Sequence, residues 1–172
     1  MNESQTKTYN DFVLPPNVVS KIDVSHLVSE VEKLDNDLTA AAVRAKTGVS
    51  EHTQPVLSEQ LIEFLNQNQL KLGSSHERTE LIKQLRMLKD AVPTVHMTFA
   101  VEADRESLQQ IAQWLRSSVH PQAVVAVGLQ PALVAGVYLR TPNKVHDLSL
   151  RAMLDGQHEN LVKELETLRG SK

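Results

Sequence analysis

Seven histidines occur among the 172 residues of this chain, and histidine is a common metal ligand, so a metal site is the first possibility to consider. Two imidazoles on one helix share a metal when they are three or four residues apart. No two histidines of this chain have that spacing. They stand alone at His26, His52, His76, His96, His120, His146 and His158. We therefore expect structural or surface roles for them, and no metal site.

Other patterns for catalysis or ion binding are incomplete. Asp35 and Asp37 lack the central Gly and the distal Glu of a calcium loop, and a helical pattern surrounds them. Gly128 and Gly136 are not followed by the Gly-Lys-Ser/Thr of a phosphate loop. Neither a Gly-x-Gly-x-x-Gly stretch nor a serine nucleophile elbow occurs. The sequence therefore predicts no catalytic residue, no cofactor and no metal ligand.

Asp147, Ser149 and Arg151 form the polar set with the strongest case for a specific role. Asp147 is placed to cap a helix that begins there, with Ser149 in its first turn and Arg151 one turn further on. Capping together with a local Asp–Arg ion pair is one interpretation. Contact with a partner protein is the other, and both can hold at once.

Trp114 is the only tryptophan, and it lies beside the apolar stripe of a predicted helix rather than on it. Burial in the core is the more common fate of such a residue. A half-exposed tryptophan that anchors a partner protein is the alternative.

The elements around the polar set are strands. Apolar runs at 124–127 and 133–139, separated by Gly and Pro signals, predict two buried strands that pair with each other. Gly136 lies inside the second run. Because glycine weakens a strand, its presence indicates a bulge or a close backbone contact. We expect a helix from Asp147 and a separate last helix after Gly156.

Upstream, alternation from Val95 to Val101 predicts a strand, and Asp104 is placed to cap the helix that follows. This order of elements indicates an α/β domain at 93–172 with a three- to four-stranded sheet and helices. Val92 and Pro93 mark its start, because the residue before proline is pushed out of helical geometry.

The first half of the chain carries three helical patterns. The first runs from Asp23, its predicted N-cap, to Ala45 with Gly48 as its stop. The second is capped by Ser58, and the third opens with a Ser74/Glu77 capping box. We expect a flexible arm at 1–14 and a small helical bundle at 15–92. The predicted fold class is thus α+β, a helical bundle followed by an α/β domain.

Composition excludes several classes of function. The net charge is -3 and aromatic residues make up 3%, whereas a nucleic-acid surface needs a basic face and stacking rings. The absence of cysteine excludes disulfides, thiol nucleophiles and cysteine-based zinc sites. No stretch approaches the roughly 20 apolar residues of a membrane span, and residues 1–7 lack the apolar core of a signal peptide. We expect a soluble cytoplasmic protein that meets a membrane only through partners.

The stretch from Pro131 to Arg151 resembles the delta subunit of F-type ATP synthases, a family whose mitochondrial members are the oligomycin-sensitivity-conferring proteins. The family carries a proline, small and aliphatic residues, a Gly-Gly step, an aliphatic strand, a polar turn with Lys and Val, and Asp-x-Ser-x-Arg. The matching residues are Pro131, Leu133, Val134, Gly136, Val137, Leu139, Lys144, Val145, Asp147, Ser149 and Arg151. Ala135 stands where the family usually has its first glycine. The resemblance extends from Val95 to Leu165.

The resemblance implies a non-catalytic stator subunit, which links the catalytic head to the peripheral stalk and resists rotor torque during proton-driven ATP synthesis. It implies that the helical half accepts the N-terminal helix of a head alpha subunit and that the C-terminal half engages the C-termini of the b subunits. It also implies no self-association and a place on the cytoplasmic face of the membrane. The residues it singles out, as structural or stalk-binding, are Pro131, Gly136, Lys144, Asp147, Ser149 and Arg151.

The residues by themselves are compatible with two other classes of function. One is a non-enzymatic adaptor or scaffold of another assembly, and genes for ATP synthase subunits beside this one would argue against it. The other is an enzyme with a dispersed active site, for which the sign would be a cluster of perturbed titratable groups in a concave pocket.

Overall fold

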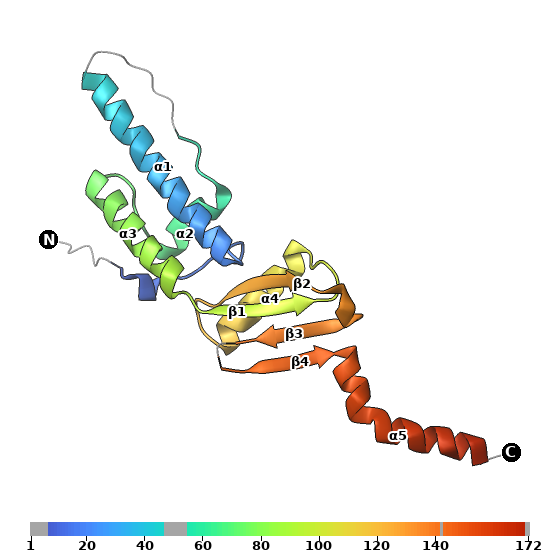
Figure 1. The fold of residues 1–172 in the computed structure, drawn as a ribbon. Helices are drawn as coiled ribbons and strands as arrows, with labels where there is room; N and C mark the ends of the chain where they lie inside the picture. Colours follow the sequence, from blue (N-terminus) through green and yellow to red (C-terminus); the bar gives the residue numbers. More distant parts are fainter. Residues whose placement is uncertain (1–6, 47–54, 142, 171–172) are drawn as a thin grey trace. The chain divides into compact units, whose positions relative to one another are not determined.

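The computed structural model describes residues 7–46, 55–141 and 143–170. The fold class is α+β, as the sequence predicts. In chain order the elements are η1 (Tyr9–Asp11), α1 (Lys21–Lys46), α2 (Glu59–Asn68), α3 (Ser75–Ala91), β1 (Thr94–Phe99), α4 (Arg105–Ser118), β2 (Val124–Leu129), η2 (Pro131–Leu133), β3 (Gly136–Arg140), β4 (Val145–Ser149) and α5 (Leu150–Gly170) (Figure 1). The chain divides into two compact units, which are described separately. A helical unit comprises Met1–Pro93 and Leu108–Val124, and a sheet unit comprises Thr94–Ser107 and Val125–Lys172.

The helices of the first unit begin where short-range capping is available. The hydroxyls of Ser58 and Ser74 accept the N–H groups of Leu61 (3.2 Å) and Glu77 (3.1 Å), so both predicted caps are confirmed. In α1 the cap is Ser20, not Asp23. The Ser20 hydroxyl accepts the Asp23 N–H, and the Asp23 carboxylate accepts the Ser20 N–H at 2.8 Å. This reciprocal capping box starts the helix at Lys21. The predicted stop at Gly48 lies outside the described residues.

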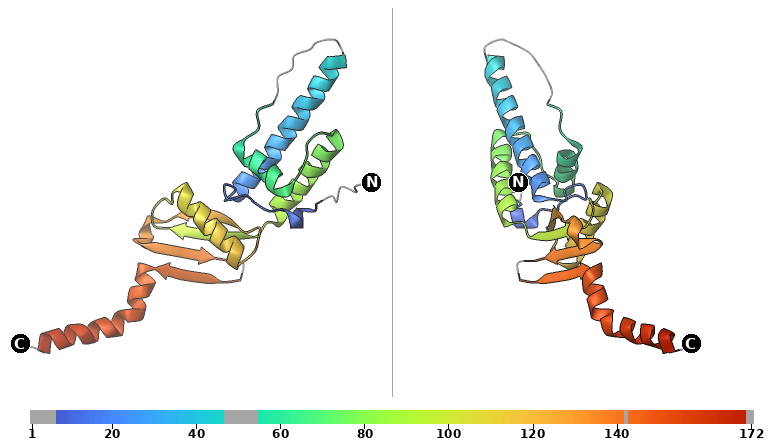
Figure 2. Two further views of the ribbon diagram at one scale, coloured as in Figure 1. Left: turned by 180° about the vertical axis from the view of Figure 1, so that it is seen from behind. Right: turned by 45° about the vertical axis from the view of Figure 1, so that its right-hand side comes forward.

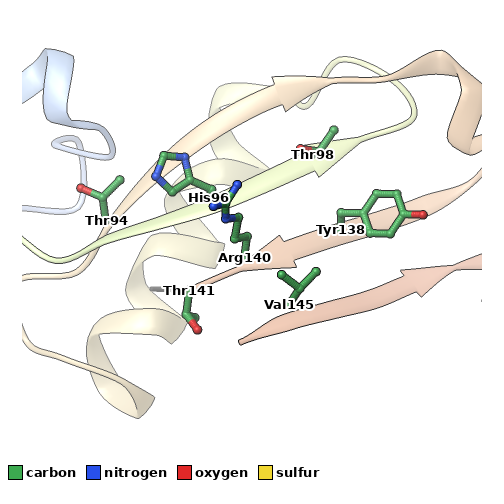
Figure 3. A pocket seen from close by; sticks show the side chains of 7 residues that line it. All are labelled: Thr94, His96, Thr98, Tyr138, Arg140, Thr141 and Val145. Atoms are coloured by element: carbon green, nitrogen blue, oxygen red, sulfur yellow. The ribbon is translucent and has the colours of Figure 1, made fainter. Parts of the chain in front are cut away.

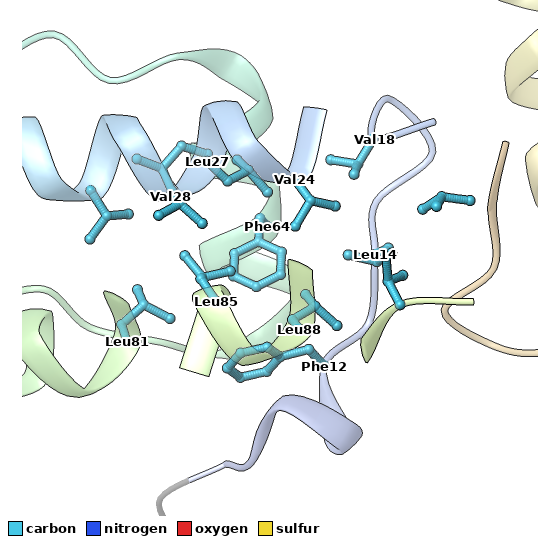
Figure 4. Close-up of a cluster of buried hydrophobic side chains, with 14 residues drawn as sticks. Phe12, Leu14, Val18, Val24, Leu27, Val28, Phe64, Leu81, Leu85 and Leu88 are labelled. Atoms are coloured by element: carbon cyan, nitrogen blue, oxygen red, sulfur yellow. The ribbon is translucent and has the colours of Figure 1, made fainter. Parts of the chain in front are cut away.

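The core of the helical unit is formed by apolar stripes of α1 and α3, which lie side by side (Figure 2), and by α2. The rings of Phe12 and Phe64 pack edge to face, with centroids 5.4 Å apart. Phe12 and Leu14 belong to this core (Figure 4), whereas their sequence predicted a flexible arm. Burying these two side chains removes apolar surface from water, which favours docking of the segment over an extended arm.

Three polar side chains hold residues 9–18 against this core. Asn68 accepts the N–H of Val13 at 2.8 Å and donates to its carbonyl at 2.9 Å. Gln122 donates to backbone carbonyls in the first half of the segment. Arg116 of α4 donates to carbonyls in the second half, and its burial lowers the pKa of its guanidinium. These bonds satisfy backbone acceptors that enter neither helix nor sheet.

The sheet unit contains a mixed four-stranded sheet with strand order β2-β1-β3-β4. β1 pairs with β3, and β3 with β4, both antiparallel. The prediction that the runs at 124–127 and 133–139 pair with each other is wrong, because β1 lies between them. The second run is also shorter than predicted, since residues Pro131–Leu133 form η2 and the strand begins at Gly136.

Residues Val145–Ser149 form strand β4 where the sequence predicted the start of a helix. The Thr141 N–H donates to the Lys144 carbonyl at 2.8 Å, and this turn returns the chain along β3. Pairing with β3 satisfies the backbone groups of β4 that face β3, and this favours the extended form. The helix α5 then begins at Leu150 and continues through Gly156, where a break was expected. A single glycine inside a helix costs only about 1 kcal/mol, so the helix can continue.

Candidate interaction site

The residues singled out by the resemblance are divided by the fold into two groups. Gly136 and Ser149 face each other in the β3–β4 register, and α5 begins directly after Ser149. Asp147 and Arg151 flank this point in the sequence, so these four residues lie at the junction of β3, β4 and α5, which we call the hairpin–helix junction. Lys144 stands beyond the opposite end of the hairpin, roughly 13 Å or more along β4 at about 3.3 Å per residue.

Pro131 is connected to the hairpin–helix junction by backbone hydrogen bonds of the residues that follow it. It opens η2, and the Val134 N–H donates to its carbonyl at 3.1 Å. The next residue, Ala135, accepts the N–H of Leu150 at 3.0 Å. The first backbone N–H of α5 is therefore bonded to the segment that Pro131 begins.

Gly136 is required by the geometry of this junction. Its φ is +97°, a backbone conformation that residues with a Cβ rarely adopt. A Cβ at this position would lie 2.4 Å from the Leu148 carbonyl oxygen and 2.6 Å from the Ser149 Cα. The close backbone contact expected for a glycine within a strand is thus present between β3 and β4.

Val134 is a strained residue that was not among the predicted site residues. It has φ 62° and ψ -54°, and the Ala135 N–H donates to the Leu133 carbonyl across it at 2.6 Å. These angles and this bond define a γ-turn of the rare positive-φ form, which is unfavourable for a β-branched residue. No local pattern of the sequence signals it, because valine is the wrong residue type for such a turn.

Asp147 lies on β4 and does not cap a helix. Its carboxylate accepts the Ser149 N–H at 2.9 Å, while the Ser149 hydroxyl accepts the Ala152 N–H at 3.2 Å and caps α5. Hydrogen bonds from Ser149, together with one from the Tyr138 hydroxyl, lower the pKa of Asp147 below its ordinary value. The bond with Asp147 raises the pKa of Tyr138. Tyr138 was missed because its position opposite Asp147 follows only from the β3–β4 register.

Arg151 points into solvent, with 88% of its side chain exposed. Its ion pair is with Asp155 at 4.0 Å, one turn along α5, and not with Asp147 as expected. Exposed pairs of this kind contribute about 0 to 1 kcal/mol, so this pair holds Arg151 only weakly. Its guanidinium is accessible to a partner.

Exposed apolar side chains follow directly after the hairpin–helix junction. On α5 the exposed fraction lies between 39% and 65% for Leu150, Met153, Leu154, Val162 and Leu165, which we call the α5 apolar set. At 3.6 residues per turn, Leu150, Leu154 and Leu165 fall within about 60° of one another around the helix axis. Leu148 at the end of β4 is exposed as well. Exposed apolar residues that gather on one helix face are typical of an interaction surface.

Trp114 is 57% exposed, so the prediction that it belongs to the core is wrong. The alternative, an anchor for a partner, stays a prediction.

Within residues 7–46, 55–141 and 143–170, no three or more His, Cys, Asp or Glu side chains form a group that could hold a metal ion. The helices in these ranges include none with the length and apolar character needed to cross a membrane.

A chain of the Toxoplasma gondii mitochondrial ATP synthase hexamer, determined by cryo-EM, is similar to this protein with 19% sequence identity and a TM-score of 0.34. The similarity covers 78% of this chain and 84% of that chain. No protein-family model and no curated protein matches the sequence. A structural similarity of this size carries no argument about function, which must come from the residues of the chain itself.

Proposed function

We propose that this protein is a non-catalytic stator subunit of an F-type ATP synthase, of the delta type, and that it links the catalytic head to the peripheral stalk. The observation that carries the proposal is the ordered series of residues from Pro131 to Arg151, which resembles the family in residue type, order and spacing. An adaptor or scaffold of another assembly is the alternative, and the experiment below separates the two.

Several residues of this series stabilise the hairpin–helix junction. This shared structural role is one reason why they occur together in one chain. Gly136 permits close approach of β3 and β4, and Ser149 caps α5. Ala135, which replaces the family's first glycine, is not among the residues with positive φ. Alanine is therefore tolerated there without backbone strain, and this departure from the family pattern is compatible with the proposal.

The α5 apolar set is the surface we assign to the peripheral stalk. A helix of a b subunit with an apolar stripe would cover it in a helix-to-helix contact. A stator must hold under torque, which calls for nanomolar affinity, or about -12 kcal/mol. Each fully buried Leu or Met contributes about 1.5 to 3 kcal/mol before the entropic cost of association, so several members of the set must be buried together.

For the helical unit, we propose the N-terminal helix of a head alpha subunit as the partner, and this assignment follows from the resemblance alone. Exposed apolar side chains in this unit are dispersed over its helices and include Ile22, Val43, Ile62, Met87 and Trp114. We place the assembled protein on the cytoplasmic face of the membrane, where it is held through the complex.

An affinity purification from gently solubilised membranes of the protein's own source tests the proposal. The tagged full-length chain should recover the head alpha and beta chains together with b, identified by mass spectrometry. Leu154→Glu should reduce recovery of b, because a charge in an apolar contact is left desolvated and unpaired. The matched control is Lys163→Gln, which changes the net charge by the same amount at an exposed position of α5. It lies about 80° or more around the helix axis from every member of the α5 apolar set and should leave recovery of b unchanged.

Recovery of a different assembly, or of no partner at near-native expression, would support the adaptor alternative. Equal loss of b in both variants would contradict the assignment of the α5 apolar set while leaving the stator role itself in place. Circular dichroism of the two variants checks that each retains its helices.

A further inference from the structure

One face of the sheet carries polar side chains. His96 on β1 and Arg140 on β3 are direct neighbours in the antiparallel register, and Thr98 is opposite Tyr138. Side chains two residues apart on a strand share a face, so Thr94 lies on this face as well. Figure 3 places the imidazole of His96 and the guanidinium of Arg140 next to each other above the strands.

These side chains, together with Thr141 and Val145, line an open pocket of about 640 Å³ (Figure 3). A pocket of this size falls within the range of about 300 to 1,000 Å³ that is usual for small-molecule sites. Its lining combines one guanidinium, one imidazole, a phenol and threonine hydroxyls with a single aliphatic wall, and it includes no carboxylate.

The charge of this pocket differs from that of the chain as a whole, which has a net charge of -3. Within the described part of the chain, Arg140 has no ion-pair partner and its guanidinium makes no hydrogen bond. Asp147 is the carboxylate closest to the pocket in the strand register, opposite Tyr138. It already accepts the hydrogen bond of the Ser149 N–H at 2.9 Å. Among the residues that the structure describes, the imidazole of His96 makes no hydrogen bond either, so the donors of Arg140 and His96 face the open pocket.

We propose that this pocket binds the oxyanion group of a small molecule, a phosphate or a carboxylate, between Arg140 and His96. The planar guanidinium matches two oxygens of such a group with two parallel hydrogen bonds, a strong arrangement when both partners are charged. The imidazole donates from the neighbouring strand, and the hydroxyl of Thr98 can donate or accept. The Tyr138 ring and Val145 contact the remainder of the ligand. The site is independent of the stator role.

A titration by NMR of the full-length chain tests the proposal, with inorganic phosphate as one probe and acetate as the other. Ionic strength is kept constant, because added salt screens exposed charges. At least one probe should give saturable shifts of the amides at 94–98 and 138–141. Arg140→Gln should weaken binding about tenfold or more, and His96→Gln severalfold. Lys163→Gln is the control, because it removes a cation from α5 and leaves the lining intact.

Each outcome has a defined meaning. Saturation by phosphate alone assigns a phosphate-bearing ligand, and saturation by acetate alone assigns a carboxylate. Saturation by both supports the shared oxyanion chemistry. Absence of saturation with either probe overturns the proposal. Equal affinity in Arg140→Gln and Lys163→Gln does so too, provided that the spectra of both variants retain the dispersion of the folded chain.

Discussion

Replacing Gly136 by alanine should loosen the β3–β4 hairpin, because the added methyl group has no space. It would start 2.4 Å from the Leu148 carbonyl oxygen and 2.6 Å from the Ser149 Cα. Both are backbone atoms, so no side-chain rotation relieves the overlap. The hairpin must open locally, or Gly136 must leave its φ of +97°.

Two energetic effects set the size of this change. An L residue in the left-handed region costs about 1 to 2 kcal/mol relative to glycine. Overpacking against a rigid neighbour costs about 1 to 3 kcal/mol. Together they should lower the free energy of unfolding of the sheet unit by about 2 to 5 kcal/mol. Because domains are stable by only about 5 to 15 kcal/mol, this is a large fraction of the total.

Amide hydrogen exchange measured by NMR suits this test, because it reports on both units in one sample. A loss of at least about 2 kcal/mol should accelerate exchange of the β3 and β4 amides by about 30-fold or more. Amides of α1 and α3 serve as an internal reference, since they belong to the helical unit. Gly156→Ala is the matched control. No atom lies within 4 Å of a Cβ there, and alanine in α5 should stabilise the helix by about 0.5 to 1 kcal/mol.

Unchanged protection of the β3 and β4 amides in Gly136→Ala would refute this reasoning. It would mean that the two strands separate by more than half an ångström at no measurable cost, and that Gly136 has no special role. Equal acceleration in α1 and α3 would also count against it, because the effect would then not be confined to the hairpin.

Three further predictions concern residues outside this contact. Arg116→Met should destabilise the helical unit by about 2 to 4 kcal/mol, because backbone carbonyls in the segment 9–18 lose their donor. Urea unfolding followed by tryptophan fluorescence measures this loss, and Arg86→Met, which breaks an exposed ion pair, should cost about 0 to 1 kcal/mol. Val134→Gly should raise the stability of the sheet unit by about 1 kcal/mol by releasing the γ-turn strain, and an unchanged thermal midpoint would show that no strain is stored there. The pKa of the Asp147 carboxyl is lower in the folded chain than its ordinary value of 3.8. As the pH falls, the unfolded chain therefore binds a proton at this carboxyl before the folded chain does. The stability that the ionised carboxylate contributes above pH 3.8 is lost as the pH falls below that value. Urea midpoints at about pH 5 and about pH 3 should therefore differ less in Asp147→Asn than in the unchanged protein, and an equal difference would contradict the assignment.

Helix starts were largely predictable from the sequence. Ser58 and the Ser74/Glu77 pair cap their helices as expected, and the Ser107 N–H donates to Asp104 at 2.9 Å. Each of these bonds joins residues three apart, so the pattern that predicts it is complete within one turn of chain. Two caps were assigned to the wrong residue. That of α1 was displaced only to the partner within the same capping box, whereas that of α5 lies at Ser149 and not at Asp147.

The candidate site was predicted in part. Gly136 was identified because its residue type conflicts with a strand, and a conflict of that kind is visible without the fold. The role of Asp147 was misassigned because capping and strand pairing use the same residue types, and only the register with Tyr138 distinguishes them. Arg140 and His96 were not connected at all, since they lie on different strands and meet only through the β1–β3 pairing.

The sequence by itself thus determined the α+β class, the presence of most helices and strands, most of the helix caps, and the need for glycine at position 136. The tertiary structure alone decided that β1 separates β2 from β3, that residues 145–149 are extended, and that Trp114 is exposed. The physical reason is the distance along the chain between interacting groups. A cap is completed by neighbours within one turn, whereas a strand's place in a sheet depends on backbone partners tens of residues away that no local pattern specifies.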